Sequence, residues 1–220
     1  VIPGRPGGIA SSAEVEEAAA ASFKNYEVMR RAGLAPIPVF HMGESGEWLR
    51  RILDSGAEWI GLGGSVGKPN EARHQFFRRS FRVIEGARRQ VKVHGFGATT
   101  ISTMLKFPWY SVDSTRWVMA SAMGSILVPG ADARGLDYTR LTAVQVSGQG
   151  THARQAAGLG DLYHRHLTEF LKSEGLNLAR VCANQYDRNY VNIRSMMAAA
   201  EFAKVRLFFS TWMRESTNQA

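Results

Sequence analysis

The residues with the clearest chemical potential in this sequence are one carboxylate, two histidines and a pair of adjacent glycines, and each follows a short apolar segment. They are Asp113, His94, His41 and Gly63-Gly64. A carboxylate at the end of an apolar segment costs free energy unless it is paired or used, so Asp113 is a candidate nucleophile. A carboxylate nucleophile divides one difficult displacement into two easier ones. Asp113 is equally suited to cap the helix that Ser-Thr-Arg-Trp begins, and the residue types alone leave both roles open.

The glycines and histidines each have a functional and an ordinary interpretation. Gly95 and Gly97 flank Phe96, and without Cβ atoms they would let the backbone approach a planar ligand. Gly63-Gly64 is also compatible with an ordinary turn between a strand and a helix. The stretch GLGGSVGK lacks the Gly-Lys-Ser/Thr ending of a phosphate-binding P-loop. Histidine is a pH-sensitive donor or acceptor, and a purely structural role for both histidines stays open.

Short apolar segments alternate with helical patterns along the first part of the chain, which indicates the elements that position these side chains. The predicted strands cover residues 36–41, 58–62, 91–94, 110–113 and 125–128, and the predicted helices cover 12–31, 47–53, 70–89, 100–106 and 116–123. Such alternation predicts an α/β fold with parallel strands and right-handed crossovers. In a barrel and in an open sheet alike, active sites lie at the carboxyl ends of the strands. We therefore expect His41, Gly63-Gly64, His94-Gly95 and Asp113 to meet at one edge of a sheet.

The rest of the sequence is less regular, and we expect a single domain over residues 1–220. Residues 130–160 are rich in Gly, Thr and Gln and are interpreted as an irregular excursion. Helices are predicted over 160–173 and 189–209, and residues 178–183 are interpreted as one more short strand. About five strands before residue 130 are too few for an eight-stranded barrel, so we expect the N-terminal part of such a fold to be missing from this chain.

Composition and charge favour a soluble protein that meets a polyanion. The formal net charge is +8, and a surface of that sign attracts the phosphate backbone of nucleic acids, although an inert basic surface is the alternative. No apolar run approaches the roughly 20 residues of a membrane-spanning helix. The single cysteine, Cys182, cannot form an internal disulfide, and the sequence opens without a secretory signal. We therefore expect a cytoplasmic protein with no membrane partner.

Four segments, taken in order, resemble a known family. PVFHMGE, WIGLGGSVG, VHGFGATT and WYSVDSTRW follow one another at intervals similar to those in the second half of the tRNA-guanine transglycosylase barrel. That superfamily has a Gln-Gly strand end, an Ile-Gly-Gly-Leu loop, a Met-Gly-Val-Gly loop and a Val-Asp-Met-Phe-Asp strand at these places. The similarity covers residues 36–130. It implies a (β/α) barrel of the TIM type, with residues 1–130 as its C-terminal part and residues 131–220 as an excursion followed by C-terminal helices.

The resemblance also implies roles for individual residues. Asp113 matches the nucleophile that attacks the sugar C1′ and holds a covalent glycosyl-enzyme while the base is exchanged. His94 stands where the family has a methionine that packs on the base, and Glu44 is an additional neighbour of the base edge. The family's other essential carboxylates lie on earlier strands, which implies that this chain lacks part of its active site. The full set of matched base-binding positions is His41, Met42, Gly43, Gly63, Gly64, His94 and Gly95.

Two departures from the family favour DNA over tRNA as the substrate. The zinc site of three Cys and a His is missing, since Cys182 is the only cysteine, and we expect no zinc, no other metal and no cofactor. Ser114–Trp117 stands where the tRNA enzymes carry Leu-Pro-Thr-Arg. The segments VFHMGE and PWYSVDS resemble the phage and genomic-island branch, which inserts 7-deazaguanines into DNA. The predicted partners are therefore DNA and a 7-deazaguanine such as 7-cyano-7-deazaguanine, in a bacterium or a phage-infected host.

Three other interpretations remain open. They are a transglycosylase of the same superfamily acting on tRNA, a noncatalytic nucleic-acid-binding subunit, and an unrelated barrel enzyme with a small phosphorylated substrate. A homodimer or a complex with a partner protein is compatible with each. Arg116, Arg78 and Arg79 are predicted to contact nucleic acid, although a solvated outer helix face explains Arg78 and Arg79 equally well.

Overall fold

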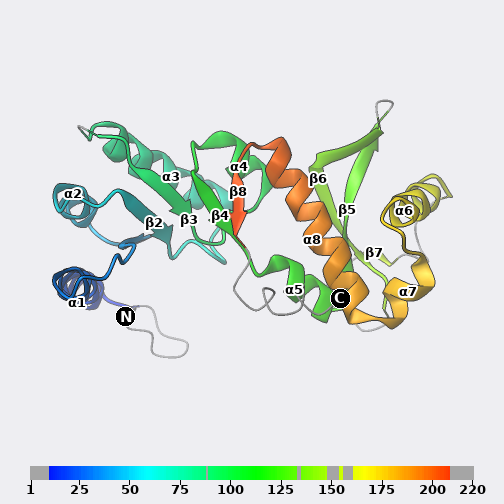
Figure 1. Cartoon of the computed structure of the whole chain (residues 1–220), viewed down its shortest axis with the longest axis horizontal. Helices are drawn as coiled ribbons and strands as arrows, with labels where there is room; N and C mark the ends of the chain where they lie inside the picture. The colour runs from blue at the N-terminus through cyan, green and yellow to red at the C-terminus, as the bar shows by residue number, and fades with distance from the viewer. Residues whose placement is uncertain (1–9, 88, 133–134, 148–153, 156–160, 209–220) are drawn as a thin grey trace. The chain divides into compact units, whose positions relative to one another are not determined.

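The computed structural model describes residues 10–87, 89–132, 135–147, 154–155 and 161–208 (Figure 1). These residues fall into two compact units, each with its own strands and helices. Unit 1 comprises Val1–Ala98 and Lys106–Asp113, and unit 2 comprises Thr99–Leu105 and Ser114–Ala220. The predicted single domain over residues 1–220 stays a prediction. The described helices are too short or too polar to span a lipid bilayer.

Unit 1 is a parallel sheet with helices, as the alternation in the sequence predicts. The strands lie in the order β1-β2-β3-β4, and each pairs in parallel with its neighbour. The α/β class and the parallel pairing are thus confirmed for this part of the chain. The elements are α1 (Ser12–Arg31), β1 (Val39–His41), α2 (Gly46–Asp54), β2 (Trp59–Gly63), α3 (Asn70–Glu85), β3 (Lys92–Gly95) and β4 (Ser111–Asp113).

The helices of unit 1 begin and end where local chemistry requires it. Ser11 and Glu14 form a capping box at the start of α1, in which each side chain accepts a hydrogen bond from the other residue's backbone N–H. The Ser45 side chain caps α2 in a similar way. Helix α3 ends at Glu85, four residues before the predicted end at Arg89, and Gly86 is its C-cap.

The register of the four strands separates two faces of the sheet. Paired residues of parallel strands share a face, and successive residues along a strand alternate between faces. Phe40, Leu62, Val93 and Val112 point to the helix-covered face, where all four are buried and Phe40 contacts Phe76 of α3, with ring centroids 5.7 Å apart. The opposite face carries a row of paired residues, Val39, Gly61, His94 and Ser111, and next to it His41, Gly63 and Asp113.

Unit 2 is built on an antiparallel hairpin with helices on both of its faces. Strand β5 (Ser125–Asp132) pairs with β6 (Gly135–Gln145), and β6 pairs in parallel with the short β7 (Arg154–Gln155). Ile126 and Val128 pack with side chains of α6 (Asp161–Ser173), whereas Leu127 packs with α5 (Arg116–Ala122) and α8 (Gln185–Phe202). The remaining elements are α4 (Ile101–Lys106), whose last residue belongs to unit 1, α7 (Leu178–Ala183) and β8 (Arg206–Phe208).

Unit 2 corrects several predictions. The predicted strand 125–128 does not continue the parallel sheet, because it turns back at once into β6 and needs no crossover. Residues 130–160 were expected to be irregular, yet 135–145 form a strand whose Thr, Val and Tyr residues suit a pleated surface. Residues 178–183 form helix α7, since Asn177 caps it by accepting from the Arg180 N–H. The last long helix ends at Phe202, and 206–208 are extended.

Asn192 links α8 to the hairpin and to α5, and this gives a test of the unit 2 fold. Its buried amide donates to the carbonyls of Trp117 (2.9 Å) and Ser125 (3.2 Å) and accepts from the Leu127 N–H (2.6 Å). We expect Asn192→Ala to lower the free energy of unfolding by about 2–4 kcal/mol, because it leaves buried backbone groups unsatisfied. Asn189→Ala is the matched control on the same helix, since the Asn189 amide oxygen has no partner among the described residues.

Urea denaturation followed by circular dichroism measures both variants. The control should not lower the free energy of unfolding, because the buried Asn189 amide oxygen has no hydrogen bond to lose among the described residues. Equal losses in the two variants would contradict the structural role of Asn192.

Candidate active site at the carboxyl edge of the parallel sheet

The carboxyl ends of four adjacent strands form the edge at which the predicted site residues lie. His41 ends β1 and pairs with Gly63 at the end of β2. The backbone hydrogen bonds continue past the strands, from the Met42 N–H to the Gly63 carbonyl (3.0 Å) and from the Phe96 N–H to the Leu62 carbonyl (2.9 Å). This pairing fixes the start of each loop relative to its neighbour.

Asp113 ends β4 and is held by the loop that follows β3. Its Oδ1 accepts a hydrogen bond from the Gly97 N–H at 2.8 Å. Its Oδ2 lies 3.9 Å from Nε2 of His94, which is beyond ordinary hydrogen-bond length. The Asp113 side chain is 37% exposed, and the His94 side chain is 11% exposed. The carboxylate is therefore accessible on one side and anchored on the other, and the sequence-based alternative of a helix N-cap does not describe its contacts.

The surroundings of Asp113 favour its ionised form. Burial raises the pKa of the carboxyl group, but His94 and the Gly97 N–H stabilise the negative charge and lower the pKa below its ordinary value of 3.8. At neutral pH Asp113 is thus a carboxylate, which is the form that a nucleophile requires.

Ser111 orients the imidazole of His94. The Ser111 hydroxyl lies 2.9 Å from Nδ1, and both side chains are buried. A hydroxyl that donates to Nδ1 leaves the ring proton on Nε2, the nitrogen that faces Asp113. The ring also meets Phe96 edge to face, with centroids 4.6 Å apart. His94 is therefore fixed by polar and aromatic contacts on two sides.

Glycines leave the space that the Phe96 ring and the 95–98 turn occupy. A Cβ on Gly61 would come within 2.6 Å of the Phe96 ring. Gly97 has a φ of +63°, and the Ala98 N–H returns to the Gly95 carbonyl at 3.4 Å, as in a type II turn with glycine at its third position. Gly95 belongs to the helix-covered face of the sheet, and its predicted contact with a base stays a prediction. A Cβ there would lie 2.7 Å from Ala98 and 2.8 Å from the Trp109 ring, so its glycine serves packing on the helix side.

The β1 loop brings a second carboxylate next to His41. Glu44 accepts from the His41 backbone N–H (2.9 Å) and lies 3.0 Å from its Nδ1. The Glu44 side chain is only 10% exposed. Gly63 and Gly64 lie against this loop, because a Cβ on Gly63 would be 3.3 Å from the His41 ring and one on Gly64 would be 3.2 Å from the Met42 nitrogen. His41, Glu44, Gly63 and Gly64 thus form one cluster at the edge.

Met42, Gly43, Glu44 and Arg79 line a cavity on the helix-covered side of β1. This cavity has a volume of about 440 Å³ and includes Phe40 and Phe76 in its wall. Asp113 and His94 belong to the opposite face of the sheet, so the structure does not place this part of the predicted base-binding set on their side. Arg78 and Arg79 are exposed on α3, and Arg116 is exposed at the start of α5 in unit 2.

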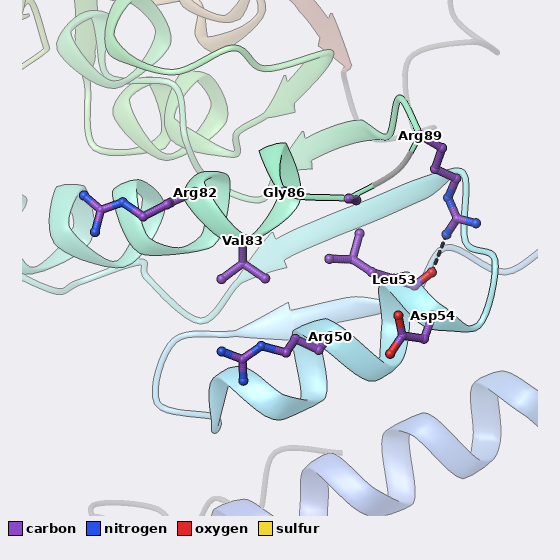
Figure 2. A pocket seen from close by; sticks show the side chains of 8 residues that line it. Arg50, Leu53, Asp54, Arg82, Val83, Gly86 and Arg89 are labelled. Atoms are coloured by element: carbon purple, nitrogen blue, oxygen red, sulfur yellow. Dashed lines mark hydrogen bonds between the residues drawn. The ribbon is translucent and has the colours of Figure 1, made fainter.

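A larger cavity of unit 1, about 740 Å³, lies between the C-terminal parts of α2 and α3 and is basic (Figure 2). Arg50, Arg82 and Arg89 line it with Asp54. Arg89 donates to the carbonyls of Leu53 and Ala57 and so satisfies acceptors at the end of α2. Crossover helices run opposite to their strands, so this cavity lies at the amino edge of the sheet, away from Asp113.

Four contributors to the edge were not among the predicted site residues. Ser111 carried a signal, because it lies two residues before Asp113 and therefore on the same face of the strand. Gly97 and Phe96 belong to the VHGFGATT segment, in which the two glycines that flank Phe96 were the signal. Arg73 was not singled out from the sequence, yet it is 7% exposed and donates a hydrogen bond to the Gly97 carbonyl.

Comparisons with protein-family models, with curated proteins and with solved structures found no match to this chain.

The lowered pKa of Asp113 predicts a pH-dependent contribution to stability. Because its folded-state pKa lies below the unfolded value, the contribution is present above about pH 4 and is lost as the pH falls through the folded-state pKa. The difference in unfolding free energy between the wild type and Asp113→Asn should be constant above about pH 5 and shrink below about pH 4.

Urea titrations across this pH range measure the difference. Asp54→Asn is the control, since Asp54 is exposed and has no hydrogen bond or ion pair among the residues described. A wild-type to Asp113→Asn difference that is the same at about pH 3 and about pH 6 would contradict the assignment.

Gly95→Ala tests whether this glycine serves packing. We expect a loss of about 1–3 kcal/mol in the free energy of unfolding, because the added Cβ meets Ala98 and the Trp109 ring in a filled core. Gly46→Ala is the control, since a Cβ there meets nothing within 4 Å. Thermal and urea denaturation compare the two. A Gly95→Ala protein as stable as the control would return Gly95 to the ligand-binding set.

Proposed function

We propose that this chain carries the nucleophile of a base-exchange transglycosylase that replaces guanine with a 7-deazaguanine in DNA. The observation that carries the proposal is the state of Asp113: an ionised and partly exposed carboxylate at the carboxyl edge of a parallel sheet, anchored by the Gly97 N–H and facing His94. The order of the four sequence segments and their resemblance to the guanine transglycosylases supply the reaction class.

The proposed fold is a (β/α) barrel of the TIM type, of which β1 to β4 are consecutive strands. Two features support it. The strands pair in parallel in sequence order, and the face opposite the helices carries glycines and polar side chains, namely Gly61, Gly63, His94, Ser111 and Asp113. In such barrels catalytic side chains come from the carboxyl ends of several strands.

The proposed reaction consists of two displacements at C1′ of the target nucleotide. In the first, an Asp113 oxygen forms a bond to C1′, the bond from C1′ to N9 of guanine breaks, and its electron pair leaves with the base. In the second, the corresponding nitrogen of the 7-deazaguanine attacks C1′ and releases Asp113. The proton that the incoming base loses equals the one that the departing guanine gains, so the exchange is balanced. Two inversions retain the configuration at C1′.

The geometry favours Oδ2 as the attacking oxygen. Oδ1 holds the Gly97 N–H at 2.8 Å, whereas Oδ2 lies 3.9 Å from His94 and faces the same side as the histidine ring. The Gly97 N–H keeps the carboxylate oriented through both displacements. His94, held by Ser111, is placed to hydrogen-bond or stack against the base next to C1′.

Access to C1′ requires that the target nucleotide leave the stack. A carboxylate cannot reach the glycosidic carbon inside a stacked duplex, so the proposal includes base flipping. His41, held by Glu44 and lying next to Gly63 and Gly64, supplies a donor or an acceptor for a base edge at the same sheet edge. The net charge of +8 supports a polyanionic substrate, and the absence of the family's zinc-binding cysteines from the sequence favours DNA over tRNA.

Exchange of labelled base by the natural full-length protein tests the proposal. We expect incorporation of labelled 7-deazaguanine into DNA, and a loss of at least about 10³-fold in Asp113→Asn, because the amide is no nucleophile. Asp54→Asn is the matched control, since Asp54 lies at the cavity between α2 and α3 and should leave exchange unchanged.

The outcomes separate the alternatives. Incorporation of the label into tRNA and not into DNA would show that tRNA is the substrate, and the proposed displacement chemistry would be unchanged. Salt-sensitive DNA binding without exchange would indicate a noncatalytic subunit. Undiminished exchange in Asp113→Asn would remove Asp113 from the mechanism.

A further inference from the structure

Arg73 is a buried cation in the first turn of α3. It lies four residues before Phe77 on the helix stripe that also carries Phe81 and Ile84, and its exposed fraction is 7%. Apolar residues normally occupy such a stripe, so an arginine in this position has to be stabilised by its polar contacts.

The contacts of Arg73 are unusual for a buried guanidinium. One terminal nitrogen donates to the Gly97 carbonyl at 3.0 Å, and Nε has no hydrogen-bond partner among the described residues. No carboxylate pairs with it in the described part of the chain, whereas exposed Arg180 pairs with Asp187 at 3.0 Å. Burial of an uncompensated charge costs stability, and burial correspondingly lowers the pKa of Arg73. A residue kept at such a cost points to a role other than stability.

The Gly97 contact connects Arg73 to the proposed nucleophile. Gly97 accepts from Arg73 through its carbonyl and donates to Asp113 through its N–H, so the two backbone groups of one residue are held from two sides. Gly97 has a φ of +63° and no side chain, and its backbone is therefore free to rotate unless such contacts fix it. The hydrogen bond that closes the 95–98 turn is long, at 3.4 Å, and the Leu62 carbonyl holds the Phe96 N–H at 2.9 Å, but neither bond involves a backbone group of Gly97.

We infer that Arg73 is a positioning residue, which fixes the 95–98 turn so that the Gly97 N–H holds the Asp113 carboxylate oriented for attack. The inference rests on the proposed function for its catalytic meaning, but the contact chain from Arg73 through Gly97 to Asp113 exists independently of the reaction. The planar guanidinium is suited to this role because it presents donors in fixed directions, whereas an ammonium is a point charge on a flexible stem.

The structural part of the inference is tested by the titration of Asp113 in the wild type and two variants of the full chain. Carbon NMR of the Asp113 carboxyl group gives its pKa in the wild type, Arg73→Lys and Arg73→Gln. We expect both variants to raise that pKa toward its ordinary value, because the loosened turn weakens the Gly97 hydrogen bond. Arg73→Lys keeps the positive charge, so a rise in that variant reports geometry and not the loss of a cation.

Arg78→Gln is the matched control, because Arg78 is exposed on the same helix. It should leave the pKa of Asp113 unchanged. An unchanged pKa in Arg73→Lys and Arg73→Gln would overturn the inference, since a merely structural arginine would affect stability and leave the titration of Asp113 alone.

The catalytic part is tested by steady-state exchange with the natural full-length protein. A positioning role predicts that Arg73→Lys lowers kcat on the order of tenfold with little change in KM, since the reacting carboxylate is misplaced while substrate binding persists. A change confined to KM would overturn it. If the wild type shows no exchange and the variants still raise the pKa of Asp113, the proposed function is rejected. The contact chain from Arg73 through Gly97 to Asp113 would still be supported.

A measurement on the wild type covers the case in which the variants fail to fold. The Gly97 amide proton should titrate together with the Asp113 carboxyl group, and the Arg73 guanidinium protons should exchange slowly with solvent. A rapidly exchanging, freely rotating guanidinium would overturn the inference without any substitution.

Discussion

Side-chain alternation along four in-register parallel strands is the constraint on which the site depends. The pairing places Gly61, His94 and Ser111 in one row and turns Asp113 to the same face, while Leu62, Val93 and Val112 are turned toward the helices. A shift of one residue in any strand would exchange these sets. Polar groups would then be buried under the helices, and apolar ones would occupy the face that carries Asp113. The packing of the apolar face thus fixes the direction of the functional side chains, even though none of them belongs to the core.

The sequence predicted unit 1 well, because its strands and helices are short, regular and separated by glycine. Parallel pairing brings the carboxyl ends of those strands to one edge, and the shared edge of His41, Gly63, His94 and Asp113 could therefore be predicted.

Contacts between elements were harder to predict. Arg73 resembled its exposed neighbours in composition, and only the periodicity of the buried stripe distinguished it. Strand β6 was missed because its Gly and Thr content suggested a loop, although Thr and Val favour pleated structure when a neighbouring strand buries one face. Met42 and Gly43 lie on the opposite side of the sheet from Asp113 because of the direction in which the loop after β1 turns. The local sequence pattern does not predict that direction.

Few groups contact the Asp113 carboxylate. A backbone N–H and a histidine hold the carboxylate, and no arginine or lysine forms an ion pair with it among the described residues. A strong cation at that place would compete with the developing positive charge at a sugar carbon, whereas a backbone donor orients the carboxylate and leaves much of its charge available. Arg73 contributes from a distance, through the turn. This arrangement suits a carboxylate that forms and releases a covalent bond.

The proposed mechanism requires that an Asp113 oxygen becomes bonded to a sugar carbon during turnover. Mass spectrometry of the full-length protein, denatured during exchange on a guanine-containing DNA oligonucleotide and digested with protease, tests this most directly. If Asp113 is the nucleophile, the digest contains a nucleotide-bearing peptide whose fragmentation places the adduct on Asp113. An adduct on a different carboxylate, or efficient exchange with no covalent adduct on any peptide, would contradict it.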